Sequence, residues 1–412
     1  MTINQKIYSY SNRGPKFRTM QPGIGVFGTG TTVRCLVPIL KTCGFQVQAL
    51  WGRTKDLAED AARDLSIPFS TNKVDDVLLH KDVDLVFISC PPHLQSPIAE
   101  KALGIGKHVI CGTPAGPGQI DAFKMVSGAR YYPSLMSLMC YGLRLLPAFD
   151  KMKTLISDGY IGDFIACEAR VHCGSMLKDD YDWMCDELMG GGVLNTIGGT
   201  IIDIVSYVTK QKAVKVHGLL KTFTKQTPKI NGIRQITSDD FCSFQMEMES
   251  GACAIITLNN HIPGQFMQEV LICGNKGRLI AKGADLYGQK NEAHKEELLY
   301  HDPMNILDVQ RSYVSETIRA DIPIPYLKGL IKLIDAVKDA FKSVAERHGW
   351  SRAPVSQAAT FEDALYIQTV IDAVRKSSTK GEWVKVNIMT EEPDPNPFLS
   401  AAVRRSTFSL YY

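Results

Sequence analysis

The chain has 412 residues, of which 45% are hydrophobic and 22% are charged, and this composition is typical of a globular protein large enough for two domains. Its 46 basic and 43 acidic residues nearly balance, and no long block of like charge occurs, so we expect neither a nucleic acid nor a membrane surface as a partner. No run of about 18 apolar residues, the length of a membrane-spanning helix, is found.

The eleven cysteines are scattered singly, and none has the Cys and His spacing of a zinc site. We therefore expect no metal, and we interpret the cysteines as reduced thiols of a cytoplasmic protein. Residues 1–20 are polar and basic without an apolar segment, which predicts a disordered arm and not a signal peptide.

Short apolar runs alternate with helical stretches between Gly23 and Cys140, as in "GIGVFG", "VRCLVPILKTCG", "FQVQALWG" and "DLVFISC". Continuous apolar strands separated by amphipathic helices are typical of a parallel sheet that is covered on both faces. We predict a doubly wound α/β domain of the Rossmann type over residues 21–140.

Longer strands follow a helix that ends at Gly159, and they alternate apolar with polar residues, as in "DFIACEARVHCG" and "ACAIITLNNHI". This alternation predicts an α+β domain over residues 141–390, with a large, open and mainly antiparallel sheet. A polar stretch without a clear pattern runs from about Asn291 to Pro325.

Two further helices are expected after this stretch, "YLKGLIKLIDAVKDAFKSV" and "TFEDALYIQTVIDAVRKSS", and they could pack back on the first domain. A strand, "EWVKVNIM", follows them. Residues 391–412 are first Pro-rich and then aromatic and basic, which predicts a tail that packs on the surface or binds a partner.

A glycine motif in "GIGVFGTGTTVRC" follows the first predicted strand and opens a helix. Gly28 permits a tight turn, and Gly30 lets the backbone approach a pyrophosphate, whose charge the free amides of the helix N-terminus stabilise. Val33 stands where the third glycine of this motif usually stands. The context favours a dinucleotide site over a strand-to-helix turn without a ligand.

The second predicted strand ends in "ALWGRTKD". An NAD site would place Asp or Glu there to bind the ribose hydroxyls, whereas this chain has Gly52, Arg53 and Thr54. A guanidinium beside a small residue suits a 2′-phosphate, so we expect NADP(H) as the cofactor. Arg53 could instead be an ordinary solvated residue at the start of a helix.

The segments "CPPHLQSPIAEKALGIGKHVICGTP", "LRLLP" and "DELMGGGVLNTIGGTIIDIV", together with the glycine turn, resemble the glucose-fructose oxidoreductase, inositol dehydrogenase and rhizopine-catabolism (Gfo/Idh/MocA) family. "ALWGRT", "GIRQITSDDFC" and "GADLYGQKN" also resemble its animal subgroup, the glucose-fructose oxidoreductase domain-containing proteins. The resemblance runs from about Gly23 to the C-terminus. It implies a Rossmann domain that binds a nicotinamide cofactor and an open sheet that forms a dimer or tetramer interface.

The motif and the resemblance together give a set of expected cofactor-binding residues. They are Gly28, Thr29, Gly30, Thr31, Thr32, Trp51, Gly52, Arg53, Thr54, Cys90, Pro91, His93, Leu94, Cys111, Thr113 and Arg144. For Arg144, an inter-domain ion pair is an equal alternative to binding a phosphate or an acidic substrate. For Cys90 and Cys111, buried inert thiols are the alternative to redox-sensitive ones.

The family carries a lysine in a Glu-Lys-Pro turn, and an aspartate and a histidine or tyrosine after the triple glycine. When these family motifs are aligned with this sequence, Thr113 stands at the lysine position, Thr196 at the aspartate position and Thr200 at the histidine or tyrosine position. Asn195 lies one residue before the acid's place. A threonine hydroxyl does not titrate near neutral pH, so we expect a pseudoenzyme that binds NADP(H) with little or no turnover.

Two other classes of function remain open. One is an active NADP-dependent oxidoreductase on a sugar-like or polyol substrate in the inter-domain cleft, with a relocated acid or base. The other is an interaction protein whose nucleotide site is vestigial, and which binds a protein partner through the open sheet or the segment 398–412. The side chains that could supply a relocated proton donor are His93, His172, Tyr181, Asp182 and Lys221.

Overall fold

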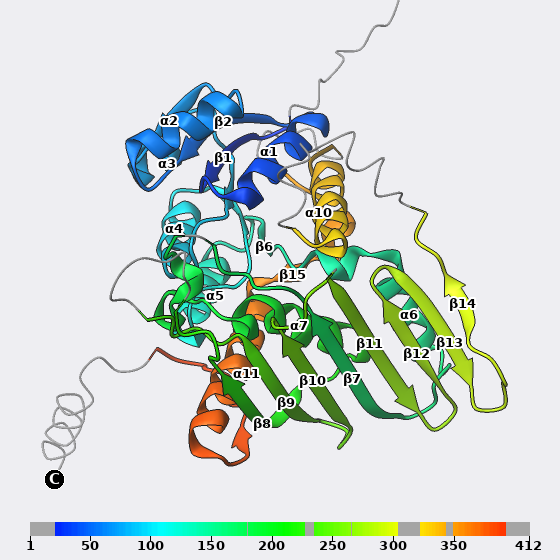
Figure 1. Cartoon of the computed structure of the whole chain (residues 1–412). Helices are drawn as coiled ribbons and strands as arrows, with labels where there is room; N and C mark the ends of the chain where they lie inside the picture. Colours follow the sequence, from blue (N-terminus) through cyan, green and yellow to red (C-terminus); the bar gives the residue numbers. More distant parts are fainter. Residues whose placement is uncertain are drawn as a thin grey trace, which may run out of the picture.

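The computed structural model of the protein describes six stretches of the chain, residues 21–178, 180–226, 235–264, 266–303, 322–342 and 349–392. The predicted arm and nearly all of the predicted tail lie outside the described residues. Figure 1 shows two large sheets, with the N-terminal sheet at the top and a broad C-terminal sheet below it.

The first sheet has seven strands in the order β15-β6-β5-β4-β1-β2-β3. Strands β1 to β6 pair in parallel, and β15 adds an antiparallel edge next to β6. The order reverses beside β1, and ligands of such sheets bind outside the carboxyl ends of the strands at this switch point. The strands are β1 (Gly23–Phe27), β2 (Gln46–Trp51), β3 (Phe69–Thr71), β4 (Leu85–Ile88), β5 (His108–Cys111), β6 (Ser137–Met139) and β15 (Ala359–Thr360).

Five helices connect these strands, and their burial follows their apolar periodicity. In the first helix, for example, all buried side chains except one cysteine are aliphatic, and they pack in one cluster with the strands. The predicted Rossmann-type α/β fold is therefore confirmed. The helices are α1 (Thr31–Thr42), α2 (Lys55–Asp64), α3 (Val74–Leu78), α4 (Pro92–Gly104) and α5 (Gln119–Tyr131).

The second sheet has nine strands in the order β14-β13-β12-β11-β7-β10-β9-β8-β16. Its pairs are antiparallel except β7 with β10, which confirms the predicted open and mainly antiparallel sheet. The strands are β7 (Phe164–His172), β8 (Ala213–Lys221), β9 (Phe241–Met248), β10 (Cys253–Asn259), β11 (Met267–Gly274), β12 (Gly277–Lys282), β13 (Asp285–Lys290), β14 (Glu297–Tyr300) and β16 (Val384–Lys385).

Two predictions about the second domain need correction. The stretch expected to lack a pattern contains β14, whose four residues form a strand because they pair with β13. The predicted strand "EWVKVNIM" is reduced to the two residues of β16, which pair with β8 at the edge of the sheet.

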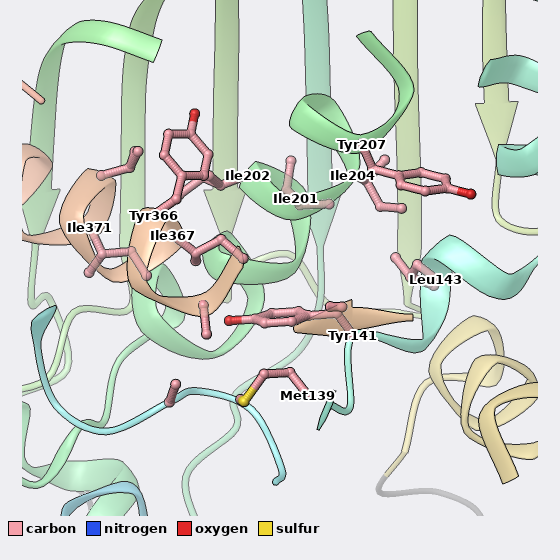
Figure 2. Packing of buried hydrophobic residues seen from close by; sticks show 14 of the residues in the cluster. Met139, Tyr141, Leu143, Ile201, Ile202, Ile204, Tyr207, Tyr366, Ile367 and Ile371 are labelled. Carbon is pink, nitrogen blue, oxygen red and sulfur yellow. The ribbon is translucent and has the colours of Figure 1, made fainter. Parts of the chain in front are cut away.

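Helices cover one face of the second sheet, namely α6 (Pro147–Ser157), α7 (Gly199–Thr209) and α11 (Phe361–Lys380). Short turns η1 (Gly142–Leu145), η2 (Trp183–Cys185), η3 (Glu187–Met189), η4 (Leu194–Gly198) and η5 (Ala353–Val355) link the larger elements. In Figure 2, isoleucines of α7 and α11 pack above Tyr141 and Met139 of the first domain. This core joins the two sheets.

The C-terminal helices lie against both halves of the molecule. Helix α11 packs on α5 and on β8, and α10 (Ile324–Lys342) packs on η1 and α1. The segment Glu187–Thr209, which contains α7, is apolar and long enough to cross a membrane, but 83% of its most apolar window is buried inside the protein. It therefore serves as a core helix between the sheet and α11.

Candidate functional site

The glycine turn after β1 has the geometry that a dinucleotide needs. Gly28 has a φ of +129°, and a Cβ there would lie 2.3 Å from the carbonyl oxygen of Ser89, so only glycine fits. Gly30 caps α1, no atom lies within 4 Å of where its Cβ would be, and no side chain caps the helix. The first amides of α1 are thus available to a phosphate.

Three threonines lie in and next to this turn. Thr29 is half-buried, and its methyl group would lie 2.9 Å from a Cβ on Gly52, which keeps that position small. Thr31 is half-buried and Thr32 is exposed in the first turn of α1.

At the end of β2, Thr54 caps α2 by accepting a hydrogen bond from the N–H of Leu57 at 3.3 Å. Arg53 is exposed, and within the described stretches its guanidinium makes no hydrogen bond or ion pair. The indole of Trp51 is instead a core group, because it is buried and donates a hydrogen bond to the carbonyl of Asn72 at 3.0 Å.

Cys90 and Cys111 lie at the ends of β4 and β5, where both thiols are buried. Gln95 joins them, since its amide donates to the carbonyl of Cys90 at 3.0 Å and accepts from the thiol of Cys111 at 3.2 Å. Burial raises the pKa of Cys90 to about 12 and that of Cys111 well above its usual range. Of the two interpretations, the structure supports buried inert thiols.

Helix α4 begins beside these cysteines, with Pro91 at its cap and His93 and Leu94 half-buried in its first turn. The Nδ1 atom of His93 is buried and has no hydrogen-bond partner among the described residues. A buried polar atom without a partner is uncommon in native proteins. Together with the open space over Gly30, it fits a bound nicotinamide nucleotide.

Arg144 does not bind a cofactor phosphate through its side chain, contrary to one of the two expectations. It is 7% exposed, and its guanidinium donates to both carboxylate oxygens of Asp203, at 2.9 and 2.8 Å from Nε. It also pairs with Asp363 of α11 at 3.1 Å. Two carboxylates neutralise the guanidinium, which supports the ion-pair alternative, although Arg144, Asp203 and Asp363 all lie within the predicted second domain and not across two domains.

The three threonines at the family's polar positions are held in different ways. Thr113 is half-buried after β5 and precedes Pro114 in a cis peptide bond. Thr196 lies in the π-helical turn η4, a type of turn that often occurs at functional sites, and its hydroxyl donates to the carbonyl of Gly192 at 2.7 Å. Thr200 lies in the first turn of α7 and is 2% exposed.

Asn195 is buried, and its amide makes two hydrogen bonds. It donates to the carbonyl of Gly190 at 2.8 Å and accepts from Gln368 of α11 at 3.1 Å. Gln368 donates at 3.2 Å to the carbonyl of Gly116 in the loop after β5. This amide clasp, defined by Asn195, Gln368, Gly116 and Gly190, ties the two domains together, so Asn195 acts as a structural group.

The other expected proton donors have structural contacts. Asp182 caps η2 by accepting from the N–H of Met184 at 2.9 Å, and the hydroxyl of Tyr181 contacts the carbonyl of Gln235 at 3.5 Å. His172 is half-buried at the end of β7, and Lys221 is exposed at the end of β8.

The sequence did not predict a polar pocket that lies where β9 begins and β10 ends. Its acids, Asp239 and Asp240, precede β9, and His261 follows β10, so no local motif joins them. The lining residues are Ser175, Met176, Leu177, Met184, Gly192, Thr224, Ile236, Ser238, Asp239, Asp240, Asn260 and His261.

The two acids of this pocket differ in their electrostatics. Burial raises the pKa of Asp239 to about 6, although one carboxylate oxygen accepts from the N–H of Leu194 at 2.7 Å. Burial alone would raise the pKa of Asp240 too, but backbone N–H groups of Phe223 and Thr224 and the imidazole of His261 at 3.1 Å lower it. An acid that titrates near 6 in a pocket that a histidine also lines can exchange protons near neutral pH.

Comparison with known proteins identifies the family to which this chain belongs. Residues 23–136 match the model "Oxidoreductase family, NAD-binding Rossmann fold", and residues 149–280 match the model of the "GFO/IDH/MocA C-terminal domain". The chain belongs to the Gfo/Idh/MocA family. The family resemblance seen in the sequence is thereby confirmed, and with it a Rossmann domain of the NAD(P)-binding type.

Relatives in animals cover almost the whole chain. Glucose-fructose oxidoreductase domain-containing protein 1 of Xenopus tropicalis is 54% identical over 394 residues, which are 95% of this chain and 100% of that protein. Glucose-fructose oxidoreductase domain-containing protein 2 of Homo sapiens is 51% identical over 387 residues, 94% of this chain and 99% of that protein.

Solved structures of this family share the fold at low identity. A levoglucosan dehydrogenase in complex with NADH and L-sorbose superposes with a TM-score of 0.73 at 20% identity, over 90% of this chain and 100% of that one. An aldose-aldose oxidoreductase from Caulobacter crescentus, complexed with glycerol, gives a TM-score of 0.67 at 19% identity, over 89% of this chain and 100% of that one.

Proposed function

We propose that the chain holds NADP(H) as a structural or sensing ligand and performs little or no turnover, as a pseudoenzyme of its family. One observation carries the proposal. Threonines stand at all three positions where the family resemblance expects a lysine, an aspartate, and a histidine or tyrosine. The hydroxyl of Thr196 is bonded to the carbonyl of Gly192 and Thr200 is buried, and a threonine hydroxyl does not titrate near neutral pH.

These replacements should lower the catalytic rate strongly. Moving a hydride to or from a carbon that bears oxygen requires a proton transfer at that oxygen by a group that titrates near the working pH. Loss of one such group lowers the rate by about 10² to 10⁴. Three positions are changed here, and turnover should fall far below that of an active member.

The choice of NADP(H) rests on the end of β2. The position after Gly52 is Arg53, which is exposed and, among the described residues, unpaired. A free guanidinium there can form charge-assisted bonds to a 2′-phosphate. The solved levoglucosan dehydrogenase carries NADH, so the two coenzymes must be compared directly on this chain.

The decisive experiment is to purify the protein gently, denature it, and identify any released nucleotide by absorbance and mass. The bound nucleotide of a second sample is then challenged with sugars, aldehydes and ketones. Released NADP(H) whose reduced-nicotinamide band no substrate changes supports the pseudoenzyme. A chain that neither carries nor binds a nucleotide would instead be the interaction protein with a vestigial site.

A substitution tests the coenzyme choice. Arg53→Ala should weaken binding of NADPH by about 10- to 100-fold, because a charge-assisted hydrogen bond contributes about 1.5–3 kcal/mol. Binding of NADH should change little. Lys55→Ala is the matched control, since Lys55 is a nearby exposed cation that already pairs with Glu59. Equal losses for NADPH and NADH would contradict the 2′-phosphate assignment.

A second candidate function is an active NADP-dependent oxidoreductase on a sugar-like or polyol substrate. The polar pocket favours it, because Asp239 and His261 could replace the missing acid and base. The ligands named in the two solved structures, L-sorbose and glycerol, belong to this substrate class. If a substrate from the challenge changes the nicotinamide band, Asp239→Asn should abolish the change while nucleotide binding persists.

The outer face of the second sheet supports a homo-dimer or homo-tetramer. Apolar side chains lie exposed on this face beside charged ones, including Ile255 on β10 and Leu219 on β8. A second copy of the chain could cover them.

We further propose a cytoplasmic location, which the free state of all eleven cysteines supports, and no role for a nucleic acid or a membrane.

A further inference from the structure

The first turn of α10 places Tyr326 against the second domain, near Phe266 and Thr200. The ring of Tyr326 packs edge-on against Phe266, with ring centroids 5.6 Å apart and an interplanar angle of 86°. Its hydroxyl is buried and makes no hydrogen bond of good geometry to a described residue. A buried phenol normally finds a partner, so this orientation is set by the packing of the ring.

The polar neighbour of this hydroxyl is Thr200, at the position where the family carries a histidine or a tyrosine. The thiol of Cys173 lies close as well. Burial raises the pKa of Tyr326 well above its usual range, and the hydroxyl therefore stays protonated and cannot serve as a base at neutral pH. The phenol thus takes up space at this site without supplying a base.

Two contacts hold α10 in this place. Gly329 packs directly on the backbone of η1, where a Cβ on Gly329 would lie 2.6 Å from the carbonyl carbon of Gly142. Lys328 forms a buried ion pair with Asp302, which follows β14. Both anchors follow Tyr326 within one helical turn, so they fix the part of α10 that carries the ring.

A second unpartnered group lies on β11. Gln268 of β11 is 3% exposed, and both its amide oxygen and its amide nitrogen lack a partner among the described residues. Phe266 lies just before β11, two residues before Gln268 in the sequence. An amide of this kind is suited to recognise a hydroxyl-bearing ligand, which would satisfy both atoms.

We propose that Tyr326 fills the space opposite Thr200 that the hydroxyl end of a substrate would occupy, so that the chain itself closes its substrate site. The inference deepens the proposed function, on which it rests for the location of the site. It names Tyr326 as the residue that decides which ligand can enter. Shortening this side chain should open a pocket of the size of a phenol.

The test uses the full chain with Tyr326→Ala and 4-fluorophenol as the probe, followed by ¹⁹F NMR. A cavity left by a truncated aromatic side chain can bind a small aromatic molecule. We expect saturable binding to the variant and none to the wild type. Adding Thr200→Val should weaken this binding about three- to tenfold, because the probe loses a hydrogen bond.

A second readout follows the bound nucleotide. In protein loaded with NADPH, Tyr326→Ala should raise acrylamide quenching of the nicotinamide fluorescence, and added phenol should reverse the increase. Tyr207→Ala is the matched control, because Tyr207 is another buried tyrosine of the core with an unpartnered hydroxyl. It should leave the quenching unchanged.

The outcomes separate this inference from the proposed function. A folded Tyr326→Ala protein that binds no 4-fluorophenol, or binds it equally well with Thr200→Val, overturns the inference whether or not a nucleotide is present. If Tyr326→Ala does not fold, the same measurements on Tyr326→Val test the inference in its place. Binding of the probe in a protein that retains no nucleotide would support the closed site and reject the cofactor proposal alone.

Discussion

At the scale of single residues, the neighbours of a side chain decide between function and structure. Arg144 has the residue type and the sequence position expected of a phosphate ligand, yet its guanidinium forms ion pairs with Asp203 and Asp363. Asp239 shows the opposite case. It begins an ordinary strand in the sequence, but in the fold it lies in a polar pocket with a pKa of about 6.

The raised pKa of Asp239 predicts how the stability depends on pH. The folded protein holds the proton up to about pH 6, whereas the unfolded chain releases it near pH 3.8. Between these values the folded state binds more protons, so its stability falls as pH rises from about 4 to 6 and stays low above. The loss should be on the order of 2–3 kcal/mol.

Urea unfolding of the wild type and of Asp239→Asn at pH 4 to 7 measures this difference. Asparagine can still accept the hydrogen bond from Leu194 but does not titrate. The free energy of unfolding of the variant, relative to the wild type, should therefore rise with pH over this window. A difference that is constant with pH would contradict the raised pKa.

At the scale of elements, α10 and η1 meet through two glycines that bring their backbones into direct contact. A Cβ at Gly329 would lie 2.6 Å from the backbone of Gly142. Although alanine favours a helix over glycine by about 1 kcal/mol, Gly329→Ala should destabilise the protein by about 1–3 kcal/mol, because the overlap forces α10 away from η1.

Gly104→Ala provides the control for this prediction. Gly104 also lies in a helix, at the end of α4, but no atom lies within 4 Å of its Cβ position. The change should leave the protein as stable as the wild type or slightly more stable. Thermal unfolding of both variants tests the contact, and equal effects would show that helix propensity alone is at work.

The elements also show what the sequence can predict. Strands such as β1, β2, β4 and β7 follow from local apolar periodicity, whereas β3 and β6 have only three residues each and show no such pattern. The three threonines follow from the family resemblance. By contrast, Arg144 finds its partners 59 and 219 residues away, and the pocket joins the start of β9 to the end of β10. No local sequence pattern predicts such long-range contacts. Strand β14 was missed because its pairing with β13 forms it.

At the scale of the whole molecule, α11 fastens the two domains to each other. Besides the amide clasp, Asp372 accepts from the N–H of Gln119 at 3.0 Å, and Arg375 donates to the carbonyl of Pro117 at 2.9 Å. The loop that follows the family's lysine position is thus bonded to the C-terminal helix. Such an interface favours one fixed angle between the domains, and it should slow the exchange of the nucleotide that we propose for the first domain.

Removing the clasp should loosen this interface. Gln368→Leu keeps the volume but leaves the carbonyl of Gly116 and the amide oxygen of Asn195 without the donor Gln368, which should cost about 1–3 kcal/mol of stability. Hydrogen exchange in the loop 115–119 and the rate of nucleotide release should both increase. Thr379→Val, at an exposed site near the end of α11, is the control and should change neither rate.

The assembly of the molecule can be tested on the open face of the second sheet. Ile255 is 41% exposed in the centre of β10 and lies beside Gln245 of β9 and Glu168 of β7, so a partner molecule that covers the sheet must cover it. Placing a charge in such a contact leaves it buried and unpaired, which costs several kcal/mol. Ile255→Arg should therefore give a monomer in sedimentation analysis at micromolar concentration, whereas Leu79→Arg, 71% exposed on the first domain, should keep the assembly of the wild type. If Ile255→Arg sediments as the wild-type oligomer, another surface carries the contact, and the open face becomes free for a different protein partner.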